Sequence, residues 1–332
     1  MTIKVAINGL GRIGRCLIRA AAEYNQWDIE IVAANGPAAT PAHLHLLKYD
    51  SVHGRFPGEI TAESEEIRFG KHKMKIFHER EPEKLPWKDL GVDVVLECSG
   101  KFTKKADAER HIAAGAKKVL ISAPSPDAES TIVYGVNNAA LKKEHKIVSV
   151  GSCTTNCLAP VAKTLNDAVG IVQGYMTTIH AYTSDQNIHD GSHKDLRRAR
   201  AATLSMVPTS TGAAKALGLV LPELKGKLDG TSIRVPTPNV SLVDLTFNAG
   251  KATSAEEINN AIKAAASGPM KGVLGTTDEP LVSIDFNHSP FSSVFDLTQT
   301  AVVGGSLVRV AAWYDNEWGF SCRMWDVTTL LN

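Results

Sequence analysis

The 332-residue chain has few of the features that mark secreted, membrane-bound or nucleic-acid-binding proteins. Its five cysteines are scattered and odd in number, which argues against a disulfide framework and favours free thiols in a reducing compartment. Its formal net charge is only +1, too small to hold nucleic acid by bulk electrostatics. No apolar run is long enough to span a bilayer, and residues 1–5 lead into a strand pattern without a signal-peptide layout. We therefore expect a cytoplasmic protein with no membrane partner and no dedicated nucleic-acid site.

Length and composition predict an ordinary globular protein of two domains. The chain exceeds the size of one typical domain, so each half is expected to build its own core. Its hydrophobic content of 43% and charged content of 21% are enough for this. We assign no metal site from the sequence.

A glycine-rich turn lies near the start of the chain. An apolar strand pattern at Lys4–Ile7 leads into the spacing G-x-G-x-x-G, which is followed by a helical pattern at Arg15–Tyr24 and a second strand pattern at Ile29–Ala34. In such a unit the glycines permit a tight turn, close approach to a pyrophosphate, and close helix–strand packing. The sequence therefore predicts dinucleotide binding. The candidate residues in this turn are Asn8, Gly9, Gly11, Arg12, Ile13 and Gly14.

The rest of the first half alternates between strand and helix patterns. These patterns lie at Val92–Leu96 (strand), Lys104–Ala114 (helix), Lys118–Ile121 (strand) and Ile147–Val150 (strand). Alternation of this kind predicts a parallel, doubly wound sheet of the Rossmann type. Gly100 and Ser122 follow strand ends, where such a sheet binds ligands, so each either forms a plain turn or contacts the cofactor.

The position expected to select the cofactor lacks a carboxylate. The second strand ends at Asn35-Gly36, where NAD sites carry an Asp or Glu that accepts hydrogen bonds from the ribose hydroxyls. Without that charge a 2′-phosphate is not repelled, although no Lys or Arg stands beside Gly36 to bind one. The alternative is that Asn35 alone serves NAD. NAD and NADP thus both remain open, and the missing carboxylate favours NADP use.

The segment Ser152–Cys157 contains the strongest candidate nucleophile. It follows the apolar stretch Lys146–Gly151 and precedes a helical pattern at Leu158–Val169, which places Cys153 at a strand-to-helix junction. The positive end of a helix dipole stabilises a thiolate at such a position. The alternative is a buried structural cysteine, and Cys157, one turn further on, fits that description better.

Further motifs complete a resemblance that covers the chain from residue 3 to about residue 330. The chain closely resembles phosphorylating glyceraldehyde-3-phosphate dehydrogenases in the order and spacing of these motifs. They are Asn8–Arg15, Ser152–Cys157, His180–Gln186, His193–Ala202, Pro208–Lys215, Arg234–Asn239 and Trp313–Phe320. The resemblance implies reversible oxidation of glyceraldehyde 3-phosphate, with inorganic phosphate, to 1,3-bisphosphoglycerate and hydride transfer to NAD or NADP.

The same resemblance implies a role for each motif residue. Cys153 matches the nucleophile that becomes a thioester, and His180 matches the base, for which an imidazole is suited near neutral pH. Thr183 and Arg234 match the ligands of the triose phosphate. The attacking phosphate is assigned to Ser152, Thr154, Arg198, Thr211 and Gly212, and the cofactor to Asn316 at the nicotinamide and Arg80 near the adenine.

The expected architecture is α/β. Residues 1–151 would form the Rossmann-type dinucleotide-binding domain, and residues 152–315 an α+β catalytic and substrate-binding domain with a mainly antiparallel sheet. A closing helix at 316–332 would pack back on the first domain. The resemblance also implies a homotetramer in which the segment 181–205 reaches a neighbouring subunit.

Three positions depart from the usual pattern of these enzymes. Gly36 replaces an Asp, Val150-Gly151 replaces Asn-Ala, and Phe320 replaces a Tyr near the nicotinamide. None of these changes removes a reacting atom.

Two other functions remain to be compared with the primary one. Erythrose-4-phosphate dehydrogenase shares residues like those around Leu85-Pro86-Trp87, but departs from the segments containing Thr183 and Thr211-Gly212. A dinucleotide-sensing or RNA-contacting binding protein would use the first domain alone, and the neutral charge and the Cys153–His180 pair weigh against it.

Overall fold

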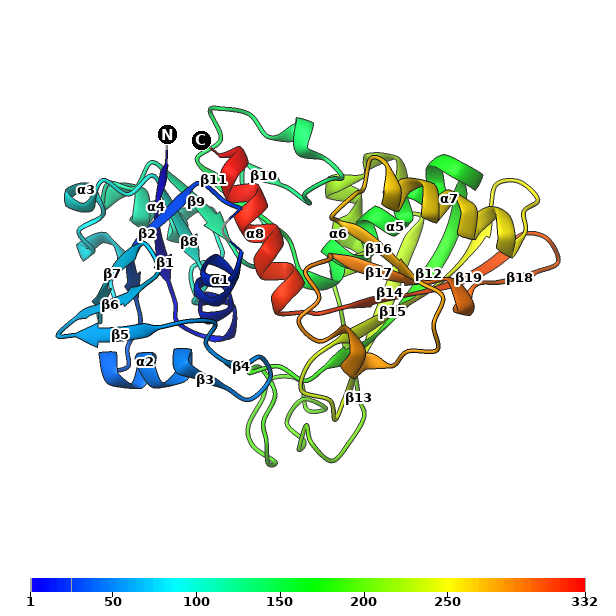
Figure 1. Cartoon of the computed structure of the whole chain (residues 1–332). Helices are drawn as coiled ribbons and strands as arrows, with labels where there is room; N and C mark the ends of the chain where they lie inside the picture. The colour runs from blue at the N-terminus through cyan, green and yellow to red at the C-terminus, as the bar shows by residue number, and fades with distance from the viewer. Residues whose placement is uncertain (1, 25, 332) are drawn as a thin grey trace. The chain divides into compact units, whose positions relative to one another are not determined.

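The computed structural model describes residues 2–24 and 26–331, which form two compact units (Figure 1). One unit contains residues 1–152 and 321–332, and the other contains residues 153–320. No helix in the described ranges combines the length and the apolar character needed to cross a bilayer.

The first unit is built on a twisted sheet that, in the described part of the chain, has nine strands in the order β10-β11-β9-β8-β1-β2-β7-β6-β5. The strands are β1 (Ile3–Asn8), β2 (Ile29–Asn35), β5 (Ile60–Glu63), β6 (Glu66–Phe69), β7 (His72–Phe77), β8 (Val94–Glu97), β9 (Lys118–Ile121), β10 (Ser130–Thr131) and β11 (Ile147–Ser149). All neighbours pair in parallel except at one edge, where the pairs β5–β6 and β6–β7 are antiparallel and β7 still pairs in parallel with β2. The predicted parallel sheet is confirmed.

Helices pack on this sheet, and short helices and a hairpin lie in the connections between its strands. They are α1 (Arg12–Glu23), α2 (Thr40–Lys48), α3 (Trp87–Leu90) and α4 (Lys105–Ala113), with the short helices η1 (Pro82–Lys84) and η2 (Asn138–Ala140) and the small hairpin β3 (Tyr49–Asp50) and β4 (Gly54–Arg55). Trp87 of α3 and Ala108 of α4 join a buried cluster with Ala6, Val95 and Val119 of the sheet. Burial of these apolar side chains, roughly 25 cal/mol per Å² removed from water, holds helices and sheet together.

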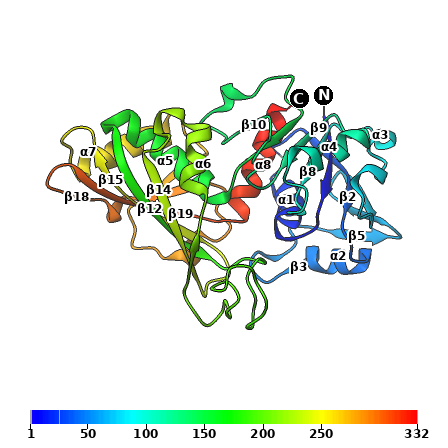
Figure 2. The ribbon, with the colours of Figure 1, turned by 180° about the vertical axis from the view of Figure 1, so that it is seen from behind.

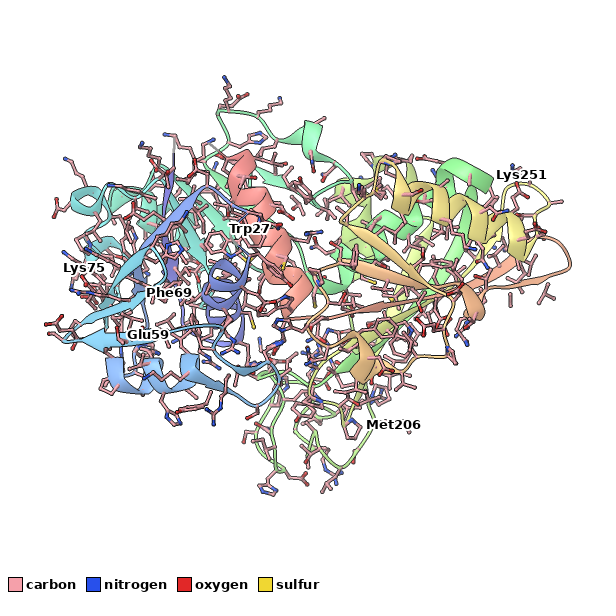
Figure 3. All side chains as sticks on the ribbon, in the orientation of Figure 1. Trp27, Glu59, Phe69, Lys75, Met206 and Lys251 are labelled. Atoms are coloured by element: carbon pink, nitrogen blue, oxygen red, sulfur yellow. The ribbon has the colours of Figure 1, made fainter. Side chains whose placement is uncertain are left out.

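The last helix, α8 (Trp318–Leu330), runs beside α1 in both views of the ribbon (Figures 1 and 2). Its Trp325 donates a hydrogen bond from Nε1 to the carbonyl of Leu17 at 3.0 Å. Trp27, labelled in Figure 3, packs against Trp325 at 6.2 Å between ring centroids and donates to Asp326 at 2.7 Å. These contacts attach residues 321–330 to the first unit.

The second unit contains a sheet whose main path is β13-β14-β12-β15-β19-β17-β16, with β18 paired to β19. The strands are β12 (Ile171–Ala181), β13 (Val207–Ser210), β14 (Leu228–Val235), β15 (Ser241–Ala249), β16 (Leu274–Thr277), β17 (Ser293–Asp296), β18 (Ala301–Val303) and β19 (Leu307–Tyr314). Only the pairs β12–β14 and β16–β17 are parallel in the described part of this unit. The predicted mainly antiparallel sheet is confirmed.

One face of this sheet is covered by helices. They are α5 (Cys153–Val169), α6 (Ala213–Val220) and α7 (Ala255–Ser267), and the short helices η3 (Pro222–Leu224), η4 (Ser283–Phe286) and η5 (Leu297–Gln299) lie in the connections. Residues of β15 alternate between buried and partly exposed, as expected for a strand with one covered face. Helix α5 begins at Cys153, five residues earlier than the predicted Leu158, so the thiol lies on the first residue of the helix.

Candidate functional site

A pocket of about 590 Å³ opens at the carboxyl ends of β1, β2 and β8 in the first unit. Parallel sheets of this type bind ligands at that edge. Its lining includes the predicted residues Asn8, Gly9, Gly11, Asn35, Gly36 and Arg80. The other lining residues were not predicted from the sequence, and they are Leu10, Pro37, Ala38, His43, Leu46, Glu79, Cys98, Ser99, Lys101 and Phe102.

The three glycines of the first turn meet different needs. Gly9 has φ of +107°, and a Cβ there would lie 2.5 Å from the backbone nitrogen of Ser99. A Cβ on Gly14 would lie 2.0 Å from the carbonyl oxygen of Gly9, so this glycine allows α1 to pack on the turn. Gly11 faces open space and caps α1 without a side chain that could satisfy its first N–H groups. The pocket therefore has an open helix N-terminus, which favours an anionic group such as a pyrophosphate.

Other predicted cofactor residues lie behind or beside this pocket. Arg12 donates to Asp50 through Nη2 at 3.1 Å. Although burial opposes it, hydrogen bonds from Arg12 and from the backbone of His53 and Val52 hold the pKa of Asp50 well below its usual value. Ile13 and Gly14 lie in the first turn of α1, and the backbone N–H of Ser122 donates to the backbone carbonyl of Glu97 at 3.0 Å.

A chain of hydrogen-bonded, buried polar side chains begins at two residues that line the pocket. Asn35 donates to Asn8 at 2.7 Å, and Asn8 donates to Glu97 at 2.6 Å. Glu97 lies 3.0 Å from Nε2 of His111, whose Nδ1 lies 3.0 Å from Nε1 of Trp87. Glu97 and His111 were missed by sequence reasoning, although a carboxylate ending the apolar run Val94–Glu97 was a usable signal, because buried charges need partners.

In the second unit, Cys153 and His180 face each other. The sulfur of Cys153 lies 3.5 Å from Nε2 of His180, which lies near the end of β12. Nδ1 of His180 lies 2.6 Å from the carbonyl oxygen of Ala181 and 3.2 Å from Nη1 of Arg234, and the shorter contact favours a proton on Nδ1 that is donated to the carbonyl. Nε2 of the neutral ring is therefore the nitrogen that can accept the thiol proton. The structure brings together the two residues expected to react.

Burial works against charge on both members of this pair. Burial raises the pKa of Cys153, and the charge of Arg234 and hydrogen bonds involving Thr154 lower it. Burial and the charges of Arg234 and Arg198 lower the pKa of His180, against the effect of its bond to Ala181. His180 is thus held as an unprotonated imidazole, whereas the thiolate expected at Cys153 depends on Arg234 and the start of α5 to offset desolvation.

Arg234 and Thr183 form one cationic, hydroxyl-bearing corner beside this pair. Parallel pairing of β12 with β14 places Arg234 opposite His180. Nη1 of Arg234 donates to the carbonyl of Ala181 at 3.2 Å and to Oγ1 of Thr183 at 3.3 Å. A guanidinium and a hydroxyl held together in this way can bind a phosphate.

Thr154 is oriented by a residue that sequence reasoning did not select. The hydroxyl of Tyr314 lies 2.9 Å from Oγ1 of Thr154 and 2.9 Å from Oγ1 of Thr178. The ring of Tyr314 meets that of His180 edge to face, with centroids 5.9 Å apart. Tyr314 therefore contacts both the first turn of α5 and the ring of His180. Its position within the motif Trp313–Phe320 is the feature of the sequence that could have identified it.

Asn316 is connected to the strand that carries His180. Oγ of Ser241 donates to Oδ1 of Asn316 at 2.8 Å and accepts from the backbone N–H of Ala181 at 3.0 Å. Ser241 was also missed, because a lone serine in a strand pattern has no distinctive signal.

Arg198 and Thr211, two of the remaining predicted phosphate ligands, form hydrogen bonds with residues other than Cys153 and His180. Arg198 is paired with Asp185 and donates from Nε to Oγ1 of Thr209 at 2.9 Å. Thr211 accepts from the backbone of Ala213 at 3.2 Å, and Gly212 caps α6. Ser152 is the last residue of the first unit before Cys153.

The departures from the usual pattern fit their surroundings. Gly151 has φ of +69°, a conformation that favours glycine, and its N–H donates to Oγ of Ser149 at 2.9 Å. Val150 and Phe320 are both buried.

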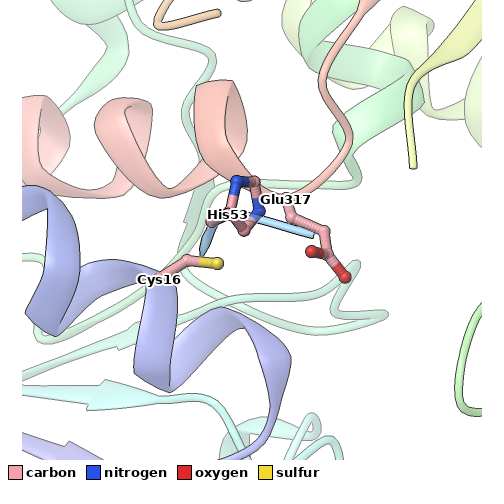
Figure 4. Close-up of side chains that lie close together, drawn as sticks. All are labelled: Cys16, His53 and Glu317. Carbon is pink, nitrogen blue, oxygen red and sulfur yellow. The ribbon is translucent and has the colours of Figure 1, made fainter. Parts of the chain in front are cut away.

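One further pair of possible metal ligands lies in the first unit. Cys16 of α1 and His53, between β3 and β4, have ligand-type atoms within 4.8 Å of one another (Figure 4). Glu317, also drawn there, belongs to the second unit. Two ligands fall short of the four that closed structural sites use, so the pair supports no metal assignment.

Comparison with known proteins identifies the family. Residues 3–105 match the model of the glyceraldehyde 3-phosphate dehydrogenase NAD binding domain, and residues 152–316 match that of its C-terminal domain. The chain is 62% identical over 331 residues to the glyceraldehyde-3-phosphate dehydrogenase of Xanthobacter flavus and 59% identical to that of Cereibacter sphaeroides, in both cases across 100% of this chain and 99% of the relative. It is 55% identical to the enzyme of Pseudomonas aeruginosa, across 98% of this chain and 97% of that enzyme. The chain belongs to the glyceraldehyde-3-phosphate dehydrogenase family.

Proposed function

We propose that this chain, an enzyme that oxidises glyceraldehyde 3-phosphate with NAD, does so by the phosphorylating route through a thioester on Cys153. The observation that carries the proposal is the distance of 3.5 Å between the sulfur of Cys153, at the first residue of α5, and the unprotonated Nε2 of His180. A nucleophile beside an oriented base is the arrangement that covalent catalysis requires.

The proposed reaction begins with addition of the sulfur to the aldehyde carbon. Nε2 of His180 takes the thiol proton as the C–S bond forms and returns it to the carbonyl oxygen, which becomes the hydroxyl of a hemithioacetal. A bound nicotinamide supplies the hydride acceptor. His180 then takes the hydroxyl proton, which leaves a thioester on Cys153. An oxygen of inorganic phosphate attacks this thioester, the thiolate leaves, and an acyl phosphate, 1,3-bisphosphoglycerate, is released.

We assign the triose phosphate to Thr183 and Arg234. Their hydrogen bond of 3.3 Å and the position of Arg234 opposite His180 support the assignment. The attacking phosphate is assigned to Ser152, Thr154, Arg198, Thr211 and Gly212. To bind this phosphate, Arg198 would have to release its ion pair with Asp185 at least in part.

The first unit would hold the dinucleotide and the second the substrate. The glycine turn at the start of α1 would receive the pyrophosphate, Arg80 would lie near the adenine, and Asn316 would hold the nicotinamide amide. The uncharged Gly36 leads us to propose that NADP is accepted as well as NAD.

We also propose that the chain assembles as a homotetramer. Between β12 and β13 the segment 182–206 has neither helix nor strand, and it exposes several large apolar side chains. These are Ile188, Leu196, Leu204 and Met206, the last labelled in Figure 3. Exposed apolar side chains gathered in one segment are typical of a protein interface.

Steady-state kinetics test the reaction. Glyceraldehyde 3-phosphate and erythrose 4-phosphate should be compared as substrates, each with and without inorganic phosphate. We expect glyceraldehyde 3-phosphate to give the higher kcat/KM and sustained turnover to require phosphate. If erythrose 4-phosphate is the better substrate, the assignment passes to erythrose-4-phosphate dehydrogenase. If turnover continues unchanged without phosphate, the phosphorylating route is wrong.

A further inference from the structure

The space beside Gly36 is filled by a side chain from another element. A Cβ built on Gly36 would lie 2.9 Å from both Cε1 and Nε2 of His43, which projects from α2. A side chain at position 36 and the imidazole of His43 therefore compete for one volume. In dinucleotide sites that volume holds the carboxylate that binds the ribose 2′-hydroxyl.

The side chain of Asn35 is already bonded to other residues and does not replace the missing hydrogen-bond acceptor. Its amide nitrogen donates to Oδ1 of Asn8 at 2.7 Å and to the carbonyl of Glu79 at 2.8 Å. Its amide oxygen accepts from the backbone of Glu79 at 2.9 Å. Because the amide oxygen already accepts a bond and both amide hydrogens are donated, we expect a ribose hydroxyl to bond another partner.

His43 is buried yet unsatisfied. Its side chain is only 4% exposed, and neither ring nitrogen forms a well-aligned hydrogen bond with the described residues, although the backbone of Gly36 and Ala38 is close enough to raise its pKa. It lines the same pocket as Gly36 and Gly11. A buried polar group without a partner costs free energy, about 1–3 kcal/mol, and is expected to gain one when a ligand binds.

The charges around His43 favour an anion at this corner. Burial lowers the pKa of His43, and so do the positive charges of His78 and Arg15, while the backbone at Gly36 and Ala38 raises it. The rings of His43 and His78 are parallel, with centroids 6.4 Å apart. Glu65 lies 3.0 Å from Nε2 of His78 and is the main cause that raises the pKa of His78. The other charged groups that line the pocket are Glu79, Arg80 and Lys101.

We propose that His43 recognises the 2′ group of the adenosine ribose, bonding a hydroxyl as a neutral ring and a 2′-phosphate as a protonated ring. The inference rests on the proposed function, since it takes the pocket to be the adenosine end of the dinucleotide site. One residue would then serve both NAD and NADP, which a carboxylate cannot do. Because a phosphate above pH 7 is already largely a dianion, binding it to a neutral His43 takes up one proton.

Three adenosine nucleotides isolate the 2′ group. They are 5′-ADP, 2′-deoxy-5′-ADP and 2′,5′-ADP, and their dissociation constants are to be measured by calorimetry on the whole enzyme at pH 7.0 and 8.5. The variant is His43→Leu, and the matched control is His45→Leu, an exposed histidine on the same helix.

The wild type and His45→Leu should bind 5′-ADP about three- to tenfold more tightly than its 2′-deoxy form, the effect of about one hydrogen bond. Relative to 5′-ADP, 2′,5′-ADP should weaken at least fivefold from pH 7.0 to 8.5. In His43→Leu both differences should disappear. The assignment is overturned if the variant weakens all three nucleotides equally, which would indicate a structural role, or changes none of them.

The outcomes separate this inference from the proposed function. If the wild type binds none of the three, the dinucleotide site itself is wrong, and His43 loses its role with it. If it binds 5′-ADP but not 2′,5′-ADP, then NADP is not accepted and His43 does not recognise a 2′-phosphate. The comparison of 5′-ADP with 2′-deoxy-5′-ADP then decides whether His43 recognises the 2′-hydroxyl.

A second pair of variants covers the case in which His43→Leu does not fold. Gly36→Asp in the wild-type background should lower the thermal midpoint, because its Cβ meets the His43 ring. Gly36→Asp with His43→Ala should recover the midpoint and bind 5′-ADP at least a hundredfold more tightly than 2′,5′-ADP. Equal midpoints for Gly36→Asp with and without His43→Ala would show that the two positions do not share one space.

Discussion

Nδ1 of His180 lies 2.6 Å from the carbonyl oxygen of Ala181, and Nε2 of the same ring lies 3.5 Å from the sulfur of Cys153. A carbonyl oxygen only accepts, so the contact with Ala181, which is shorter than the 3.2 Å between Nδ1 and Nη1 of Arg234, favours a proton on Nδ1 and leaves Nε2 unprotonated toward Cys153. Burial of the ring then keeps it neutral. The end of β12 thus presents a neutral imidazole to the sulfur of Cys153.

The first prediction concerns His180→Asn. Removing the base should lower kcat by about 10²–10⁴-fold and slow the alkylation of Cys153 by iodoacetamide at pH 7 by about tenfold or more. Peptide mapping after timed alkylation measures this. Cys157 is an internal control, because burial raises its pKa to about 12 and it should stay unlabelled. If Cys153 were alkylated in His180→Asn at the wild-type rate, His180 would not affect the reactivity of Cys153.

A second prediction concerns the buried carboxylate Glu97. Glu97→Leu would leave the amide of Asn8 and the backbone N–H of Ser99 without their acceptor. We expect the free energy of unfolding in urea to fall by about 2 kcal/mol or more, and binding of 5′-ADP to weaken because Asn8 lines the pocket. The exposed Glu109→Leu is the control. If Glu97→Leu were as stable as this control, the hydrogen bonds of Glu97 would not contribute to the stability of the fold.

Tyr314→Phe removes one hydroxyl that serves two threonines. Thr154 and Thr178 would each lose a partner at 2.9 Å in a buried site, so we expect a loss of about 1–3 kcal/mol in stability. We also expect kcat to fall several-fold, because Thr154 follows the nucleophile. Thermal unfolding and steady-state rates measure the two effects. Tyr175→Phe, on an exposed position of β12, should change neither.

His72 should make the fold sensitive to acid. Burial lowers its pKa from 6.5 to about 4, and its Nδ1 accepts a bond from the backbone of Ile31 at 3.1 Å, which protonation would break. The unfolded chain therefore binds the proton first as pH falls. The stability is complete above pH 6.5 and decreases by about 3 kcal/mol as pH falls to 4.

Urea unfolding of His72→Gln at several pH values measures this contribution. The variant should lose less stability between pH 6.5 and 4 than the wild type, and His189→Gln, at an exposed position, should behave like the wild type. Identical slopes in all three proteins would exclude His72 as the cause.

Local patterns were sufficient to predict the fold class, the glycine turn and the position of Cys153 at the start of a helix. Strand and helix periodicity and the spacing of Gly9, Gly11 and Gly14 depend on neighbours within a few residues, so they can be read along the chain. The same holds for Cys153, whose place between a strand and a helix follows from the residues on each side. The helix begins five residues earlier than expected because capping is decided by backbone geometry rather than by periodicity.

Only the tertiary structure decided which distant residues meet. Arg234 lies beside His180 because β12 and β14 pair in one register, and no local pattern states a register. His43 fills the space beside Gly36, while Asn35 is committed to Asn8 and Glu79, because a helix and a loop close over the end of β2. The sequence by itself determined the chemistry that is available. Packing between segments far apart in the chain determined which groups are buried, paired or left ready for a ligand.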